Sequence, residues 1–242
     1  NKKNNKFNSI LSENKNLKYL WDKKLKYFPK IIVSNDNYLI TEFIQNNTNI
    51  PNTTKKDFLE AVVRIHSISS KLYGFDFDTQ IGGLRHKNNY NNDWVKFFTD
   101  TRLIYMFNIA NKTNPMSSEI NNKIELLINK IGNYIPRNPK PLLLHGDLWE
   151  GNILFKDNEF RGFIDPGSFF GHNEMELAYL RWFNPVFIDI NFLAKYNEYI
   201  TVDKNYLYYE PVYQLYYALC NVALWDKSYI KEVKRLLLKI GI

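Results

Sequence analysis

Apolar residues recur at every third or fourth position along much of the chain, and this spacing predicts helices with one buried face. The first such stretch stops before Pro29, because proline cannot continue a helix. Thr54, with Asp57 three residues later, resembles a capping box in acid form and predicts the start of another helix. Helices are predicted over residues 9–21, 54–72, 93–107, 118–131, 174–183, 192–199, 206–224 and 229–240.

Short β-prone runs interrupt the helical pattern. Residues 31–33 and 38–44 flank a turn-rich Ser-Asn-Asp-Asn tetrapeptide and predict an antiparallel hairpin. Three more strands are predicted at 142–144, 153–155 and 160–164, and the last two are joined across Lys-Asp-Asn-Glu. The fold class is therefore predicted to be α+β, with a strand-rich insert at 141–165 in a mainly helical part. Loops between short strands commonly present reactive groups, so chemistry is expected at this insert.

The composition is that of a packed globular protein. With 242 residues, 45% hydrophobic and 24% charged, the chain is long enough for one large domain or two lobes. Cys220 is the single cysteine, so it cannot form an intrachain disulfide and is expected to be a small core residue. No run resembles a secretory signal or a membrane-spanning segment. These features predict a cytoplasmic protein that does not bind membranes.

The positive charge is a weak indication of a nucleic-acid partner. Lys and Arg number 32 against 25 Asp and Glu, which leaves a net charge of +7. The basic residues are spread along the whole chain, whereas a nucleic-acid surface gathers them on one face. The chain also has 32 asparagines, a bias typical of AT-rich genomes that can also raise the lysine content. We therefore predict no nucleic-acid partner, and the oligomeric state stays open.

The most informative segment is HGDLWEGN at residues 145–152. A phosphoryl-transfer site needs one carboxylate to orient the attacking hydroxyl, and an amide oxygen with a second carboxylate to hold Mg²⁺ against the phosphates. Asp147 fits the first role and Asn152 the second, at the Asp-x4-Asn spacing that the protein-kinase catalytic loop also uses. Asp165 ends an apolar strand and fits the third role. The predicted hairpin between Asn152 and Asp165 would bring these two ligands side by side.

Simpler explanations exist for each of these residues. Asp147 and Asn152 could be ordinary turn residues, and Asp165 before a proline could only start a turn. His145 could be a core histidine whose hydrogen bonds are satisfied. Their order and the strands between them favour a site, in which we assign His145 to bracing the loop and Asp147 to general-base chemistry.

These motifs resemble a known superfamily. His-Gly-Asp-x4-Asn followed by Ile-Asp-Pro is similar to the motifs of the aminoglycoside phosphotransferase and choline kinase superfamily, which shares a bilobal protein-kinase-like fold. In finer detail HGDLWEGN, with Trp149 and Gly151, resembles the HGDLWxGN motif of the fructosamine or ketosamine kinase family. Further similar stretches extend the resemblance nearly end to end, at residues 73–83, 93–103, 163–178 and 213–222.

The resemblance implies ATP- and Mg²⁺-dependent phosphorylation of a sugar hydroxyl on a ketosamine, either a small molecule or protein-bound, which is a glycation-repair activity. It implies that Asp147 is the catalytic base and that Asn152 and Asp165 are the metal ligands. Trp149 would wall the sugar pocket, because an aromatic face suits the C–H surface of a sugar ring. A place in the core is the alternative for this residue.

Nucleotide-binding residues are implied nearer the N-terminus. Glu42, Phe43 and Ile44 lie where the family's interlobe hinge offers backbone groups to adenine, and a plain strand end is the alternative. Glu13 matches the glutamate that pairs with the ATP-binding lysine, and a solvated helix charge is the alternative. Such a pair would fix the lysine against the phosphates.

Three polar residues follow the metal motif. Glu176 stands where the family usually has an aspartate that braces the catalytic loop, and its extra methylene can still reach if the backbone retreats. His172 and Glu174 are nearby, with bracing and substrate contact both open and a solvated helix start as the alternative.

The expected organisation is two-lobed. Residues 1–44 would be the remnant of an N-terminal ATP-binding lobe with its hinge, and residues 45–242 the helical C-terminal lobe with the catalytic loop and metal site. The phosphate-covering loop and the first strands are missing from this lobe. The ATP lysine is expected a dozen or so residues before Glu13; Lys2 and Lys3 are candidates at 11 and 10 residues, and a lysine outside these residues is the alternative. A kinase for another hydroxyl substrate (a polysaccharide sugar, choline or an aminoglycoside) and a non-catalytic kinase-like binding module are the competing hypotheses.

Overall fold

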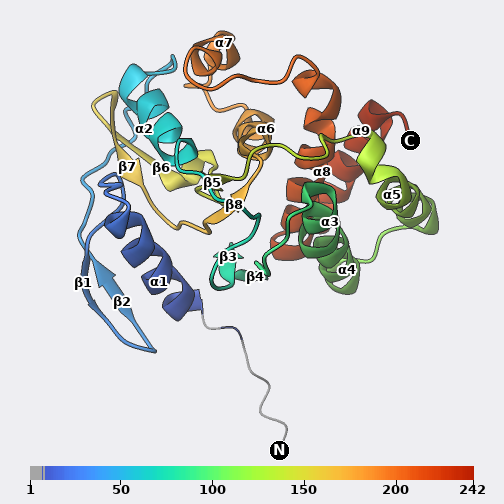
Figure 1. Cartoon of the computed structure of the whole chain (residues 1–242), viewed down its shortest axis with the longest axis horizontal. Helices are drawn as coiled ribbons and strands as arrows, with labels where there is room; N and C mark the ends of the chain where they lie inside the picture. Colours follow the sequence, from blue (N-terminus) through green and yellow to red (C-terminus); the bar gives the residue numbers. More distant parts are fainter. Residues whose placement is uncertain (1–6, 8) are drawn as a thin grey trace, which may run out of the picture.

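The computed structural model describes Phe7 and residues 9–242, which form a mixed α+β protein and confirm that predicted class. Short strands pair as four two-stranded antiparallel sheets within the described residues. Figure 1 shows the strands β5 to β8 in the middle of the molecule with helices around them. The strand-rich insert therefore lies among the helices.

The N-terminal elements lie together at the lower left of Figure 1. They are α1 (Ser9–Asp22), β1 (Ile31–Ser34) and β2 (Leu39–Thr41). β1 and β2 pair antiparallel, which confirms the predicted hairpin. The side chain of Asn35 accepts the backbone amide of Asn37 at 2.8 Å, a local hydrogen bond that closes the turn.

Helix α2 (Lys56–His66) begins without the predicted capping box. Thr54 Oγ1 instead donates to the carbonyl of Phe187 at 2.9 Å, and Asp57 accepts the amide of Phe58 at 2.8 Å. The capping-box prediction was wrong because Thr54 is used in a contact with a loop far along the chain. That contact ties the start of α2 to the C-terminal half of the molecule.

The chain leaves α2 at His66 rather than at Leu72 because the following residues pair with the segment around β5. Ser70 donates its backbone amide to the carbonyl of Pro141 at 3.0 Å. The hairpin of β3 (Thr79–Ile81) and β4 (Leu84–His86) comes next and was not predicted. Its signal was the Gly-Gly pair between the strands, since both glycines have positive φ (52° and 84°), as two-residue hairpin turns require.

A helical layer follows on the right of Figure 1. Asp93 caps α3 (Trp94–Phe98) by accepting the amide of Lys96 at 2.9 Å. A π-helical turn joins α3 to α4 (Ile104–Thr113), so the helix predicted from residue 93 is confirmed with a widened turn inside it. α5 (Ser118–Lys130) lies where the sequence predicts it.

Two antiparallel pairs form the central part. β6 (Ile153–Lys156) and β7 (Glu159–Phe163) make the predicted hairpin. β5 (Leu142–Leu144) pairs with β8 (Phe169–Gly171), a strand that the sequence analysis missed because its apolar run is only two residues long. The segment between β5 and β8 therefore begins and ends at neighbouring strands, which brings residues 145–168 into a compact loop system.

The C-terminal helices complete the core. They are α6 (Asn173–Phe183), α7 (Phe192–Asn197), α8 (Tyr206–Leu224) and α9 (Ile230–Ile240). α8 is almost entirely buried, with α4, α6 and α9 packed around it, and Cys220 lies inside this core. Within the described residues, no helix combines the length and apolar character needed to cross a membrane.

Candidate active site

The HGDLWEGN segment leaves the end of β5 in a tight turn. Gly146 has φ of 89°, and a Cβ placed there would lie 2.0 Å from the carbonyl oxygen of Gly167. No other residue type can occupy this position without moving the backbone. The turn therefore points the next residue, Asp147, away from β5 and into the protein.

His145 holds this turn from inside. Its ring stacks on Phe28 at 5.6 Å between centroids. The amide of Asp147 donates to Nδ1 at 3.2 Å, so the proton is on Nε2, which donates to the carbonyl of Ile164 at 3.0 Å. Burial lowers the pKa of His145 to about 4, so the ring is neutral near pH 7. This geometry suits a bracing role.

Glu176 on α6 reaches the loop despite its extra methylene. Its Oε2 accepts the amide of His145 at 3.0 Å, and its Oε1 accepts the amide of Gly146 at 2.7 Å. His66 on α2 adds a bond to Oε2 at 2.9 Å. Burial by itself would raise the pKa of Glu176, but the bonds from His66 and Gly146 outweigh it and leave the pKa below its usual range.

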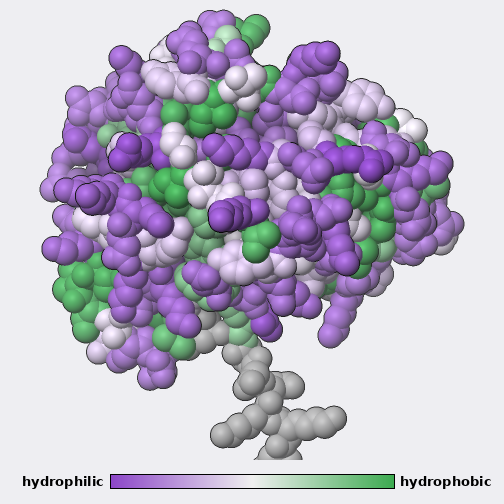
Figure 2. Space-filling model, in the orientation of Figure 1, coloured by the Kyte–Doolittle hydropathy of each residue, from purple (hydrophilic) through white to green (hydrophobic). Residues whose placement is uncertain are grey.

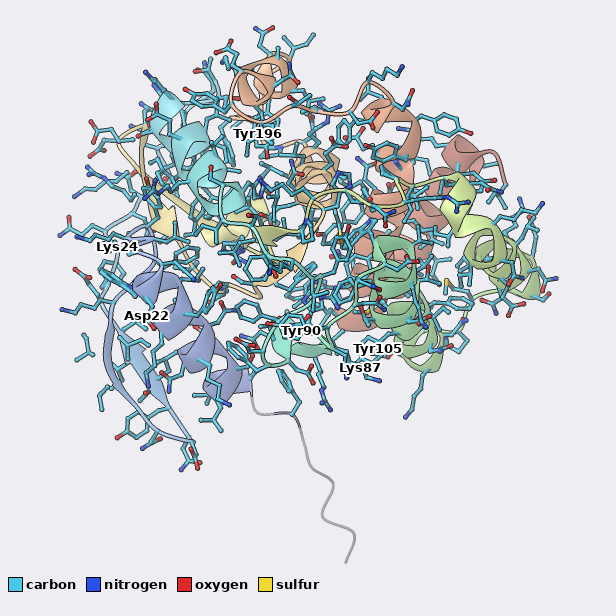
Figure 3. The ribbon with its side chains drawn as sticks, viewed as in Figure 1. Asp22, Lys24, Lys87, Tyr90, Tyr105 and Tyr196 are labelled. Carbon is cyan, nitrogen blue, oxygen red and sulfur yellow. The ribbon has the colours of Figure 1, made fainter. Side chains whose placement is uncertain are left out.

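The bracing extends outward from Glu176. Nδ1 of His66 is 2.7 Å from the hydroxyl of Tyr196, which also accepts a bond from Asn173 at 2.9 Å. Tyr196 lies on α7 and is labelled at the top of Figure 3. The HGDLWEGN loop is thus linked to α2, α6 and α7 by buried polar contacts.

Asp147 is 6% exposed and faces a small cavity. Burial raises the pKa of its carboxyl to about 7, partly offset by hydrogen bonding from the backbone of Gly82 and the side chains of Tyr179 and Asn152. The side-chain nitrogen of Asn152 also donates to the carbonyl of Asp147 at 2.8 Å. A carboxyl whose pKa is near 7 is suited to accept a proton at neutral pH.

The β6–β7 hairpin brings Asn152 and Asp165 together, as the sequence predicts. The amide of Ile164, next to Asp165, donates to the carbonyl of Asn152 at 3.1 Å. Asp165 has a positive φ of 52°, an uncommon conformation that turns its exposed side chain out of the strand direction. Nearby protein atoms nevertheless remove part of the water around its carboxyl group, and this desolvation raises the pKa of Asp165.

Glu13 comes from α1 to the same region. Burial and the nearby negative charge of Asp165 raise the pKa of Glu13 to about 7, and the side chain of Gln80 donates to it at 3.4 Å. The structure therefore brings Glu13 close to the metal-site candidates. Lys2 and Lys3, the candidate ATP lysines, lie outside the described residues.

The residues implied as the hinge line another cavity. This cavity has a volume of about 350 Å³. It is lined by Glu42, Phe43 and Ile44 together with Trp21, Lys26, Phe28, Gln45, Lys156 and Arg161. Phe43 is 79% exposed, and Figure 2 shows apolar side chains at the lower left, over β1 and β2. The hinge candidates are therefore not brought to Asp147, but they do face a cavity next to the β6–β7 hairpin.

His172 and Glu174 do not line the cavity at Asp147. They line a separate space of about 490 Å³ at the start of α6. His172 bonds the hydroxyl of Tyr213 at 2.9 Å, and Glu174 accepts the amide of Asp203 at 2.7 Å and the hydroxyl of Tyr209. These contacts support a role in fixing the start of α6 rather than the substrate contact left open by the sequence.

The cavity at Asp147 has a volume of about 270 Å³, and five of the eleven residues that line it are aromatic. Trp149 is one of them, and its ring packs against Phe183 at 5.5 Å. It is only partly buried, so it is a wall of the cavity rather than a core residue. The other lining residues are Ile81, Gly82, Tyr179, Cys220, Asn221, Leu224, Trp225 and Tyr229.

Comparison with known proteins places this site in a family. The fructosamine kinase family model matches residues 2–241. This chain belongs to the fructosamine kinase family. Its members are phosphotransferases that act on an alcohol group. A Lactiplantibacillus plantarum relative, assigned as a ketoamine kinase, is 30% identical over 220 residues, which cover 87% of this chain and 75% of the relative.

Solved structures agree with the family. A crystal structure assigned as a fructosamine-3-kinase from Haemophilus somnus has a TM-score of 0.82 and 25% identity, covering 96% of this chain and 79% of its own. The streptomycin–ATP complex of the aminoglycoside phosphotransferase APH(2")-IIa has a TM-score of 0.56 and 19% identity, covering 94% and 79%. This second likeness shows that the fructosamine kinase fold of this chain is shared with an ATP-binding kinase.

Sequence reasoning missed several residues around Asp147 in this chain. Tyr179 follows Glu176 by three positions on α6, so helical spacing could have placed both at the catalytic loop. Trp225 and Tyr229 come from the end of α8 and the turn after it, and nothing local in the sequence connects them with residue 147. Their position depends on how α8 packs against α6.

Proposed function

We propose that this fructosamine kinase transfers the terminal phosphate of ATP to a sugar hydroxyl of a ketosamine of the fructosamine or ribulosamine type, as a glycation-repair enzyme. One observation carries the proposal: the buried carboxylate of Asp147 faces an aromatic-walled cavity from a loop that Glu176 holds in place. The ketoamine kinase assignment of the Lactiplantibacillus relative supports the choice of acceptor.

In this proposal the protein contributes positioning and proton acceptance. The attacking hydroxyl donates a hydrogen bond to Asp147, which takes its proton as the phosphoryl group is transferred. Trp149 lies against the sugar ring and helps to exclude water. The bonds from Glu176 to the loop fix Asp147 before the substrate arrives, so no reorganisation is needed during the reaction.

Asn152 and Asp165 are proposed to hold Mg²⁺. Within the part of the chain that the structure describes, no three His, Cys, Asp or Glu side chains are grouped so that they could hold a metal. This fits Mg²⁺ in a kinase, which takes one or two protein side chains and otherwise phosphates and water. The nitrogen of Asn152 is used on the carbonyl of Asp147, which leaves its oxygen as the ligand atom. A bound Mg²⁺ would neutralise charge on the phosphates.

The proposed organisation is bilobal. Residues up to 44 form the described part of an ATP-binding lobe with its hinge, and residues 45–242 form the catalytic lobe. Glu13 is proposed to pair with the ATP lysine and Glu42, Phe43 and Ile44 to contact adenine. The place of Glu13 beside Asp165 supports the first assignment, because the same lysine must reach phosphates held by the metal.

The acceptor class can be tested by ATP consumption with full-length protein. We expect turnover with fructosamine and ribulosamine adducts and none with an aminoglycoside, because Asp147 is the one carboxylate among the described residues that line the cavity, and a polycation needs several. Turnover only with choline or an aminoglycoside would overturn the ketosamine assignment. No turnover with any acceptor, together with no Mg²⁺-dependent thermal stabilisation by ATP, would indicate a non-catalytic binding module.

The pH below which the activity falls should be unusually high for an enzyme that uses an aspartate as its base. Asp147 accepts a proton only when ionised, and burial raises its pKa to about 7. The value of kcat/KM should therefore fall as pH drops below about 7, by roughly tenfold per unit. A pH profile with saturating ATP measures this limit. An acid limit near 4, the usual range for aspartate, would contradict the raised pKa of Asp147.

A further inference from the structure

The cavity at Asp147 opens beside Trp225, whose side chain is 70% exposed. The inner aromatic rings of the cavity are packed against neighbours, as for Tyr179, which stacks on Tyr217 at 3.7 Å between centroids. By contrast, no ring contact or side-chain hydrogen bond holds the indole of Trp225 within the described residues. A large apolar surface at the mouth of a ligand cavity is thus left open to solvent.

Hydrogen bonds fix the backbone that carries this indole. The amide of Trp225 donates to the carbonyl of Asn221 at 2.9 Å, which ends α8. The side chain of Asp226 accepts the amide of Ser228 at 2.7 Å and starts the next helical turn. The backbone of Trp225 is therefore held between α8 and the next helical turn, which keeps its side chain at the edge of the cavity.

The size and charge of the cavity limit what it can hold. Its 270 Å³ lie just below the usual range of about 300–1,000 Å³ for ligand pockets, so it has room for about one sugar unit. Asp147 is the only formally charged residue among the described residues that line it. If the sugar of a ketosamine fills this space, its amine substituent lies outside, where Trp225 is the most exposed aromatic lining residue.

We propose that Trp225 is a specificity-determining residue, which selects ketosamines that carry an aromatic group on the amine by packing its indole against that group. The inference rests on the proposed function and deepens it. Two aromatic rings gain free energy from contact beyond the apolar area that they bury. Because this contact is far from the transferred phosphate, it stabilises the ground state and the transition state equally.

Steady-state kinetics with two synthetic acceptors test the proposal in the full-length protein. The probes are the fructose adducts of benzylamine and of ethylamine, which have the same sugar and the same secondary amine. The wild type should show a KM about fivefold lower for the benzylamine adduct, at equal kcat. Trp225→Ala should raise the KM for the benzylamine adduct to that of the ethylamine adduct, and Trp225→Phe should retain part of the preference.

Tyr208→Ala is the matched control, because Tyr208 is an aromatic residue of the same helix that is 68% exposed and lines other cavities. It should keep the wild-type preference. Equal KM values for both adducts in the wild type, or an unchanged preference in Trp225→Ala, would overturn the role of Trp225 while the kinase function stands. Absence of turnover with both adducts in the wild type would instead overturn the proposed function.

Discussion

Replacing Asp147 by asparagine in the full-length protein should reduce phosphorylation of a ketosamine by about a thousandfold, because the variant has no base to take the hydroxyl proton. The substitution keeps the shape of the side chain and removes a carboxylate whose burial already opposes its charge. The melting temperature should therefore stay the same or rise slightly. Kinetics with a fructosamine adduct and thermal unfolding of the same preparation measure both effects.

The matched control for this substitution is Asp100→Asn, an exposed aspartate in the turn between α3 and α4. It should leave kcat unchanged. If Asp147→Asn retained a rate within tenfold of the wild type, Asp147 would not be the base. If the Asp147→Asn protein were unfolded, the loop would depend on the Asp147 carboxylate for its structure, which would contradict this account.

Glu176→Gln should both destabilise the protein and lower its activity. The carboxylate accepts two backbone amides of the catalytic loop and faces His66, so an amide nitrogen in its place would confront a donor. An unsatisfied buried donor and the loss of a charge-assisted hydrogen bond should together lower the free energy of unfolding by about 3 kcal/mol. That loss corresponds to a melting temperature lower by roughly 6–12 °C for a chain of this size.

The activity of Glu176→Gln should fall in kcat more than in KM, because the loop that carries Asp147 is displaced while the aromatic walls of the cavity remain. Glu125→Gln on the exposed face of α5 is the matched control and should alter neither stability nor rate. A Glu176→Gln protein with wild-type melting temperature and wild-type kcat would show that Glu176 does not position the loop.

Local patterns in the sequence were enough to predict the local structure of the loop that carries Asp147. HGDLWEGN, followed by two short strands and Asp165, already contains the turn, the hairpin and the polar side chains, and the β6–β7 hairpin has that arrangement. The contacts within this loop and hairpin join residues that are close in the sequence, so the turn residues and the strand pattern are enough to determine them. The contact of Glu176 with the backbone of this loop was also predicted, although its link to His66 and Tyr196 was not.

The rest depends on tertiary packing. β3, β4 and β8 are too short to give a strand pattern, and they form because the chain around them is held by α1 and β5. Trp225 lines the same cavity as Asp147 only because α8 packs on α6. Thr54 shows the reverse case, where a local capping pattern is overridden by a bond to Phe187.

The most direct test of the proposed function is to identify the product. Full-length protein incubated with ATP, Mg²⁺ and a fructosamine adduct should convert the adduct to a species heavier by one phosphoryl group, detected by mass spectrometry, and Asp147→Asn should produce almost none. Formation of ADP without a phosphorylated adduct, or equal product from Asp147→Asn, would contradict a ketosamine kinase that uses Asp147 as its base.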